Sequence, residues 1–180
     1  MLSMKKRNAK TLFLVQGALI AALYVALNYA QELILPSSTS GVVQVRLSEV
    51  LTVFAVFIPS AIPGLAVGCL LSNLITVGVM PLDTLLGTGA TLLAAVCAYL
   101  LRNIKLVKVP LLSMFMPVIF NAIIIGLELE IFYIEGGFEF VGFLTQAGFV
   151  ALGELIACVI LGVPFYFMIQ KTPLRNKIAN

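Results

Sequence analysis

The sequence predicts an all-α integral membrane protein with six transmembrane helices, a short second helix and both termini in the cytoplasm. Of its 180 residues, 61% are hydrophobic and only 11% are charged, and the mean hydropathy is +1.12. A soluble domain averages about 25% charged residues, so this composition indicates a membrane protein. The length leaves room for one domain, and we expect residues 1–180 to form a single transmembrane unit.

The residue types present exclude several classes of function. The chain has no histidine, which is the commonest general base and metal ligand. Cys69, Cys97 and Cys158 each lie singly within apolar runs, so we expect buried free thiols and neither disulfides nor metal ligands. No basic stripe with interleaved aromatic residues supports nucleic-acid binding. We therefore expect no metal, no cofactor bound by this chain and no nucleic-acid partner.

The first predicted helix spans residues 11–30. Its uncharged run is about 20 residues long, the length of a full span and longer than the core of a signal peptide. Ala18, Ala22 and Ala26 recur every four residues along it. Such a stripe of small residues allows close approach of another helix, and the sequence leaves open whether that helix belongs to this chain or to a partner. A Ser/Thr-rich loop is expected over residues 36–45.

Prolines divide the remaining apolar sequence. Pro59 and Pro63 break a long apolar stretch, which predicts a short second helix over residues 46–58 and a third over 61–79. Asp83 is well placed as the N-cap of a fourth helix, 84–101. Pro110 precedes a fifth helix, 111–128, and the sixth, 143–170, is interrupted only by the charge of Glu154.

The basic residues orient these six spans. Ten of the eleven lie before the first helix, between the fourth and fifth, or after the sixth; only Arg46 does not. These three places share one side of a six-span protein, and basic residues favour the cytoplasmic side. Both termini are therefore predicted to be cytoplasmic, with the loop 36–45 and an acidic segment from Glu128 to Glu139 outside.

The polar residues of the helices gather in the predicted outer half. Arg46 and Glu49 are three residues apart and share a helix face at the outer surface, where they can pair. Scattered structural polar groups would show no such bias toward one side, whereas a pocket open to the outside would. The predicted pocket residues are Arg46, Glu49, Asn73, Asp83, Asn121, Glu128 and Glu154.

Each of these residues also has a structural interpretation. A plain N-cap is favoured for Asp83, and a place in the solvated acidic segment is favoured for Glu128. Asn73 and Asn121 fit interhelical hydrogen bonds as well as ligand contacts.

One interpretation of Arg46 and Glu49 is a purely structural ion pair, but a role in the pocket is favoured. Glu154 lacks a local partner in its apolar surroundings, which favours a functional role over a lone protonated carboxyl group.

Several short motifs resemble one known family. They are the runs 45–49 and 64–69, Asn73, Asp83 with the segments 86–88 and 90–92, and the segments 120–122 and 153–155. In this order and topology the chain resembles the QueT type of S component, the substrate-binding subunit of energy-coupling-factor (ECF) vitamin transporters. The resemblance covers nearly the whole chain.

The resemblance implies a function and partners. It implies capture of a queuosine precursor, a deazaguanine base or queuine, from outside the cell, and docking on a transmembrane coupling protein with two cytoplasmic ATPases. Ala18, Ala22 and Ala26 match the family's docking stripe, and the loop 36–45 corresponds to a lid over the pocket. The chain has no GxxxxGK phosphate loop, so ATP would be bound and hydrolysed by the partners.

The residue chemistry is compatible with a guanine-like ligand. One carboxylate, from Glu154 or Glu49, can accept both the ring N–H and the amino group of such a base. Asparagine side chains can supply both donors and acceptors. The aromatic residues Tyr24, Tyr29, Phe54 and Phe57 are candidates for ring stacking or for ordinary packing.

Three other functions stay open from the sequence. The first is an S component for another vitamin. The second is a membrane enzyme that uses Glu49 and Glu154 as acid and base, although no Ser/His, Cys/His or metal constellation supports it. The third is a stand-alone secondary transporter, against which the small size and the lack of an evident internal repeat count.

Overall fold

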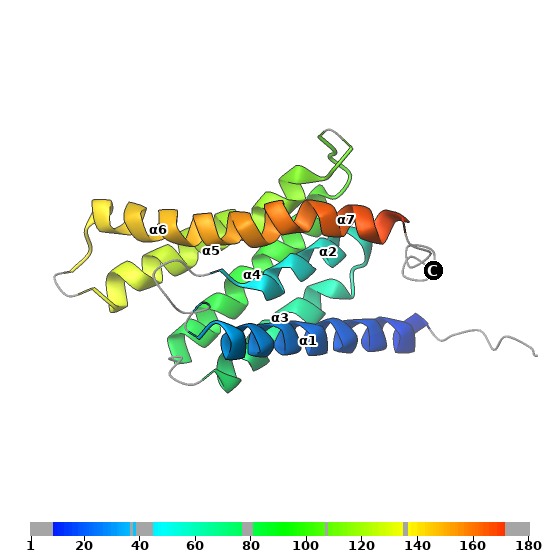
Figure 1. Ribbon diagram of the computed structural model, residues 1–180, viewed down its shortest axis with the longest axis horizontal. Helices are drawn as coiled ribbons and strands as arrows, with labels where there is room; N and C mark the ends of the chain where they lie inside the picture. Colours follow the sequence, from blue (N-terminus) through cyan, green and yellow to red (C-terminus); the bar gives the residue numbers. More distant parts are fainter. Residues whose placement is uncertain are drawn as a thin grey trace, which may run out of the picture.

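The computed structural model describes residues 9–36, 38, 45–76, 81–106, 108–134 and 137–171. Helices dominate these residues, which confirms the all-helical prediction for this part of the chain. They are α1 (Ala9–Ile34), the 3₁₀-helix η1 (Leu47–Thr52), α2 (Val53–Phe57), α3 (Ala61–Ile75), α4 (Pro81–Leu101), α5 (Leu111–Phe132), α6 (Phe140–Glu154), the π-helical segment η2 (Leu155–Leu161) and α7 (Gly162–Lys171). The last three follow one another as a single long rod (Figure 1).

Four of the helical segments are long and apolar enough to cross a membrane: α1, α4, α5 and the α6–η2–α7 rod. The second and third predicted spans are shorter. The 15 residues of α3 cover about 22 Å at 1.5 Å per residue, less than the roughly 30 Å of a hydrocarbon core. The proline-containing break after Ile58 separates α2 from α3 and leaves both segments short.

Several observed helix bounds differ from the predicted ones. The first helix continues to Ile34 and the fifth to Phe132, while the last rod begins at Phe140. The prediction that Asp83 caps the fourth helix is wrong, because α4 begins at Pro81 and Asp83 lies within its first turn. Proline suits the first helical position, where its missing N–H is not needed. Of the predicted lid loop, residues 37 and 39–44 lie outside the described residues.

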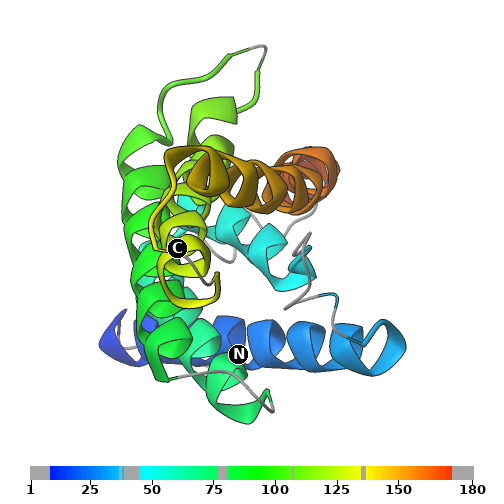
Figure 2. The same ribbon diagram turned by 90° about the vertical axis from the view of Figure 1, so that its left-hand side faces the viewer.

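The helix α1 packs on α3 through backbone contacts. A Cβ atom added to Gly64 would lie 2.6 Å from the carbonyl oxygen of Gly17, and one added to Gly68 would lie 2.7 Å from Cβ of Tyr24. Figures 1 and 2 show α1 and the α6–α7 rod on opposite sides of the bundle, with η1 and α2 between them. This arrangement buries η1, which carries Glu49, in the middle of the protein.

Charge is divided between the two ends of the bundle. The beginning of α1 and the end of α7 lie at one end, and the α4–α5 connection lies toward the same end (Figure 1). The described basic residues of these segments are Lys10, Arg102, Lys105, Lys108 and Lys171. The end of α5 and the start of α6 lie at the opposite end (Figure 1), where the Tyr133 hydroxyl donates a hydrogen bond to Asp83 in the first turn of α4.

A test of the α1–α3 contact follows from the glycine geometry. We expect Gly68→Val to lower the thermal unfolding midpoint in detergent by several degrees, since overpacking of this kind costs about 1–3 kcal/mol. The matched control is Gly89→Val on α4, where an added Cβ meets nothing within 4 Å. Equal midpoints for the two variants would contradict the close contact.

Candidate functional site

The carboxylate of Glu49 is the centre of a buried polar network. Glu49 is only 1% exposed. Its Oε1 accepts hydrogen bonds from the Tyr24 hydroxyl of α1 (2.5 Å) and from Thr91 Oγ1 of α4 (3.1 Å), and its Oε2 accepts one from Thr52 Oγ1 (3.3 Å). An isolated buried carboxylate would be very costly. Three hydroxyl donors from three segments therefore hold this one in place.

The network continues from Glu49 toward α3 and α4. Thr91 Oγ1 lies 3.4 Å from the sulfur of Cys69, and Asn73 Nδ2 lies 3.7 Å from the same sulfur. A Cβ added to Gly87 would lie 3.1 Å from Asn73 Nδ2 and 3.7 Å from a guanidinium nitrogen of Arg46. The absence of a side chain at Gly87 thus lets two polar side chains approach the backbone of α4 closely.

A second carboxylate, Glu154, meets this network from α6. It is 3% exposed; its Oε1 accepts a hydrogen bond from Asn121 Nδ2 of α5 (3.0 Å), and the Cys158 thiol lies 3.3 Å from its Oε2. Arg46 interacts electrostatically with both Glu49 and Glu154. The positive charge of one guanidinium therefore stabilises the negative charge of two buried carboxylates.

The helix geometry changes directly after Glu154. The π-helical segment η2 starts at Leu155 and contains Cys158, whose thiol also lies 3.6 Å from the Glu49 carbonyl oxygen. Short π-helical segments are rare and often occur at functional sites. Here the segment brings Cys158 between the two glutamates.

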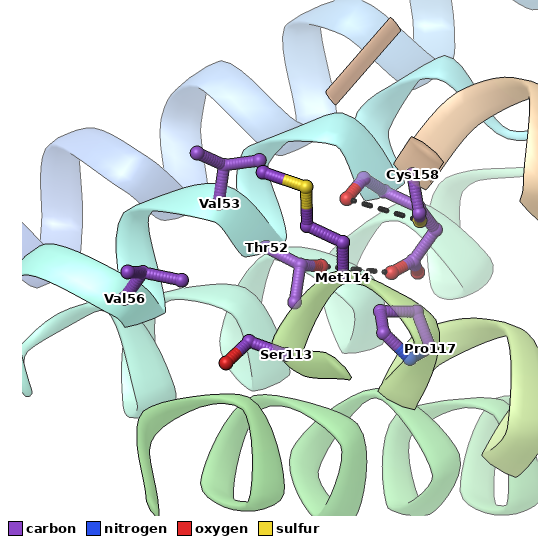
Figure 3. A pocket seen from close by; sticks show the side chains of 8 residues that line it. Thr52, Val53, Val56, Ser113, Met114, Pro117 and Cys158 are labelled. Atoms are coloured by element: carbon purple, nitrogen blue, oxygen red, sulfur yellow. Dashed lines mark hydrogen bonds between the residues drawn. The ribbon is translucent and has the colours of Figure 1, made fainter. Parts of the chain in front are cut away.

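A small cavity lies beside Glu49 (Figure 3). It has a volume of about 10 Å³ and is lined by Thr52 of η1, Ser113 and Pro117 of α5, and Cys158 among others. The buried hydroxyl of Ser113 has no hydrogen-bond partner among the described residues. The space is about that of one water molecule, so it is too small for an organic ligand.

A second polar cluster lies where α4 begins and α5 ends. The Tyr133 hydroxyl donates a 2.6 Å hydrogen bond to Asp83 Oδ2. Desolvation, followed by this hydrogen bond, raises the pKa of Tyr133 above its ordinary value, so the phenol stays protonated at neutral pH. Glu128 interacts electrostatically with Asp83 and with Arg46, which links this outer cluster to the inner network.

Gln31 of α1 anchors the segment that leads into η1. Its Oε1 accepts the backbone N–H of Leu47 at 2.8 Å, and its Nε2 donates to Ser38 Oγ at 2.9 Å and to the carbonyl oxygen of Val45. The Val45 N–H in turn donates to the Ser38 carbonyl at 3.1 Å. These bonds satisfy backbone groups at the start of η1 and hold Arg46 and Glu49 in register with α1.

The predicted pocket residues fall into two groups. The inner network joins Arg46, Glu49, Asn73, Asn121 and Glu154, and the outer cluster holds the other two predicted residues, Asp83 and Glu128.

Two expectations about depth are wrong. Glu49 does not lie at the outer surface, because its carboxylate meets Tyr24 near the middle of α1. Glu128 does not belong to a solvated segment, because α5 continues past it and leaves it 2% exposed.

Sequence analysis did not assign Thr91, Gly87 or Glu130 to the site. Thr91 and Gly87 lie within segments that carry the family resemblance, and they follow Asp83 at intervals of four on one face of α4. Glu130, also 1% exposed, accepts the backbone N–H of Glu139 at 3.1 Å and so caps the start of α6.

The candidate aromatic residues have other partners. Tyr24 is a hydrogen-bond donor to Glu49. Phe54 packs edge-on against Phe165, and Phe57 stacks on Tyr166, so these two phenylalanines belong to the core.

The alanine stripe of α1 faces outward. Ala18, Ala22 and Ala26 are exposed and line a shallow apolar groove with Val67 and Leu71 of α3. Within the chain, α1 packs on α3 through a different face, which carries Gly17 and Tyr24. The groove is therefore a surface of the isolated chain.

Comparison with models of known protein families identifies the family of this chain. A family model described as "QueT transporter" matches residues 14–171. The chain belongs to the QueT transporter family. Searches of curated proteins and of solved structures found no match. Membership of QueT, together with the four long apolar helices, makes the chain a multi-pass membrane transporter protein.

The network of this QueT protein predicts a stability effect. We expect Tyr24→Phe to reduce the free energy of unfolding by about 1.5–3 kcal/mol, because it removes a donor from a buried charged group. Thermal or denaturant unfolding in detergent measures this loss. The control is Tyr29→Phe on the same helix, where the side chain is 55% exposed; a loss no greater for Tyr24→Phe than for this control would show that Glu49 does not depend on the phenol.

Proposed function

We propose that this QueT protein is the substrate-binding subunit of an ECF-type importer in the cell membrane. It captures a queuosine precursor, a deazaguanine base or queuine, from outside and delivers it through a docked ATPase module. The observation that carries the proposal is the convergence of the partly buried Arg46 with the buried carboxylates of Glu49 and Glu154 in a chain of a transporter family. Buried ionisable groups inside a membrane bundle generally mark a substrate path.

The hydrogen-bond inventory favours Glu154 over Glu49 as the ligand contact. Glu49 already accepts three hydroxyl donors. Glu154 has one amide donor and one weak thiol contact, whereas a carboxylate offers about four acceptor positions. It therefore has capacity for the ring N–H and amino group of a guanine-like base. Arg46 and Asn73, whose side chains approach α4 closely at Gly87, are suited to the carbonyl and ring nitrogen atoms.

The charge division supports an outward-facing site. We place both termini on the cytoplasmic side because the basic ends of α1, α4 and α7 share one end of the bundle. Asp83 and Glu128 then lie toward the outside. Gln31 holds Ser38 and Val45 together, and these two residues flank most of the proposed lid loop.

The partners proposed are a transmembrane coupling protein and two cytoplasmic ATPases. This chain has no phosphate-binding loop of the GxxxxGK type, so import driven by ATP needs separate subunits. The exposed groove along Ala18, Ala22 and Ala26 fits a partner helix, because small residues permit close helix contact.

Ligand titration tests the substrate assignment. We expect 7-aminomethyl- or 7-cyano-7-deazaguanine or queuine to bind the purified protein, as measured by calorimetry in detergent, and Glu154→Gln to weaken binding roughly 10- to 100-fold by replacing an acceptor with an amide donor. Glu130→Gln is the matched control, since Glu130 is equally buried but caps α6.

Other outcomes would replace the proposal. Binding of riboflavin or thiamine in place of any deazaguanine would make the protein a subunit for another vitamin. Uptake by cells that lack the ATPase module would indicate a stand-alone transporter.

Docking is tested separately from binding. We expect Ala22→Trp to abolish co-purification with the coupling protein and ATPases and to stop uptake, while the deazaguanine affinity in detergent stays within about threefold. A tryptophan fills the groove that a partner helix needs. The control is Leu19→Trp, at a 61% exposed position of the same helix; equal loss of co-purification in both variants would argue against the groove.

A further inference from the structure

The outer cluster contains a buried carboxylate that the inner network does not use. Glu128 is 2% exposed, and neither of its carboxylate oxygens has a hydrogen-bond partner among the described residues apart from the neighbouring acid, Asp83. A buried charge without donors or a counter-charge costs several kcal/mol. Because both members of this pair are acids, they repel each other when both are ionised, and a proton or another cation shared between them relieves that repulsion.

Among the described residues, the positive charge that interacts with Glu128 is the guanidinium of Arg46, and other carboxylates also interact with it. Arg46 interacts electrostatically with Glu128, but also with Glu49 and Glu154. The other basic residues that the structure describes flank the opposite ends of their helices, as shown above. One guanidinium thus interacts with three carboxyl groups, and Asp83 adds a fourth acid beside Glu128.

Glu130 is a second buried acid of α5, but one of its carboxylate oxygens has a backbone donor, while the other has no partner among the described residues. It lies two residues from Glu128 and is equally buried, yet its Oε1 accepts the Glu139 N–H. Its carboxylate lies against Gly142, where an added Cβ would clash with it. Glu130 therefore has a structural role in capping α6, whereas Glu128 has no such role.

We propose that Asp83 and Glu128 bind a primary ammonium group carried by the substrate. This inference rests on the proposed function and adds the part of the substrate that the pair recognises. An ammonium has three N–H donors, which match the two Glu128 oxygens and the Asp83 carboxylate. A hard metal ion needs six or more oxygen ligands for Ca²⁺, or near-octahedral geometry for Mg²⁺. Among the described residues, no group of three or more His, Cys, Asp or Glu side chains is placed to hold a metal ion.

The spacing along α4 agrees with this assignment. Asp83, Gly87 and Thr91 follow one another on one face at intervals of four residues, about 6 Å per interval. Gly87 lies beside Arg46 and Asn73, the groups proposed for the ring. Asp83 is one interval farther out, within reach of a short aminoalkyl substituent on that ring. The pair therefore favours binding of a base with a cationic substituent over the same base with a neutral substituent.

The test compares two ligands that differ only in charge at one substituent. In calorimetric titrations we expect the wild-type protein to bind 7-aminomethyl-7-deazaguanine at least 10-fold more tightly than the neutral 7-cyano compound. Glu128→Gln and Asp83→Asn are each expected to weaken binding of the aminomethyl compound roughly 10- to 100-fold, with binding of the cyano compound unchanged within about threefold. Glu130→Gln is the control and should leave the preference intact. Two variants are used so that a folding failure of one leaves the other.

Each contrary outcome has a distinct meaning. Equal affinity for both ligands, or equal weakening of both in Glu128→Gln, would overturn the ammonium site and leave the proposed function standing. Failure of the folded wild-type protein to bind any deazaguanine would overturn both. Thermal stabilisation of the ligand-free protein by Na⁺ or Mg²⁺ alone, lost in Glu128→Gln, would overturn the ammonium site by assigning the pair to an inorganic cation.

Discussion

The burial of the Glu49 carboxylate is the constraint on which the rest of this structure depends. A carboxylate in an apolar bundle must be given donors, and here they come from α1, η1 and α4 through Tyr24, Thr52 and Thr91. This requirement fixes the register of three segments at once. It also explains why η1 enters the bundle: the segment anchored by Gln31 carries Glu49 inward to the donors.

The sequence was sufficient to predict the helical class and the convergence of polar residues, because both depend on composition and spacing. Prolines at 59 and 63 correctly indicated the break between α2 and α3. The inner network joins five predicted residues, including Asn121 and Glu154, which are hydrogen-bonded. Whether these residues bind a substrate stays a prediction.

The burial of individual side chains and their hydrogen-bond partners could not be predicted from the sequence. Glu128 looked solvated because it begins an acidic run, but α5 continues to Phe132 and turns its side chain inward. Tyr24 was indistinguishable from a stacking residue until the position of Glu49 was known. Both errors have the same cause: a local pattern reports charge and periodicity, whereas burial is decided by which helices pack together.

The contact between α1 and α3 has a mechanical consequence. Gly64 and Gly68 bring the backbones so close that no side-chain rotamer can absorb a displacement of one helix relative to the other. On its outer face α1 presents Ala22, and on its inner face Tyr24 holds the central carboxylate. The surface groove and the interior of the site are thus separated by the thickness of one helix, about 10 Å. A displacement of α1 at the groove therefore also moves Tyr24 and the carboxylate to which it is hydrogen-bonded.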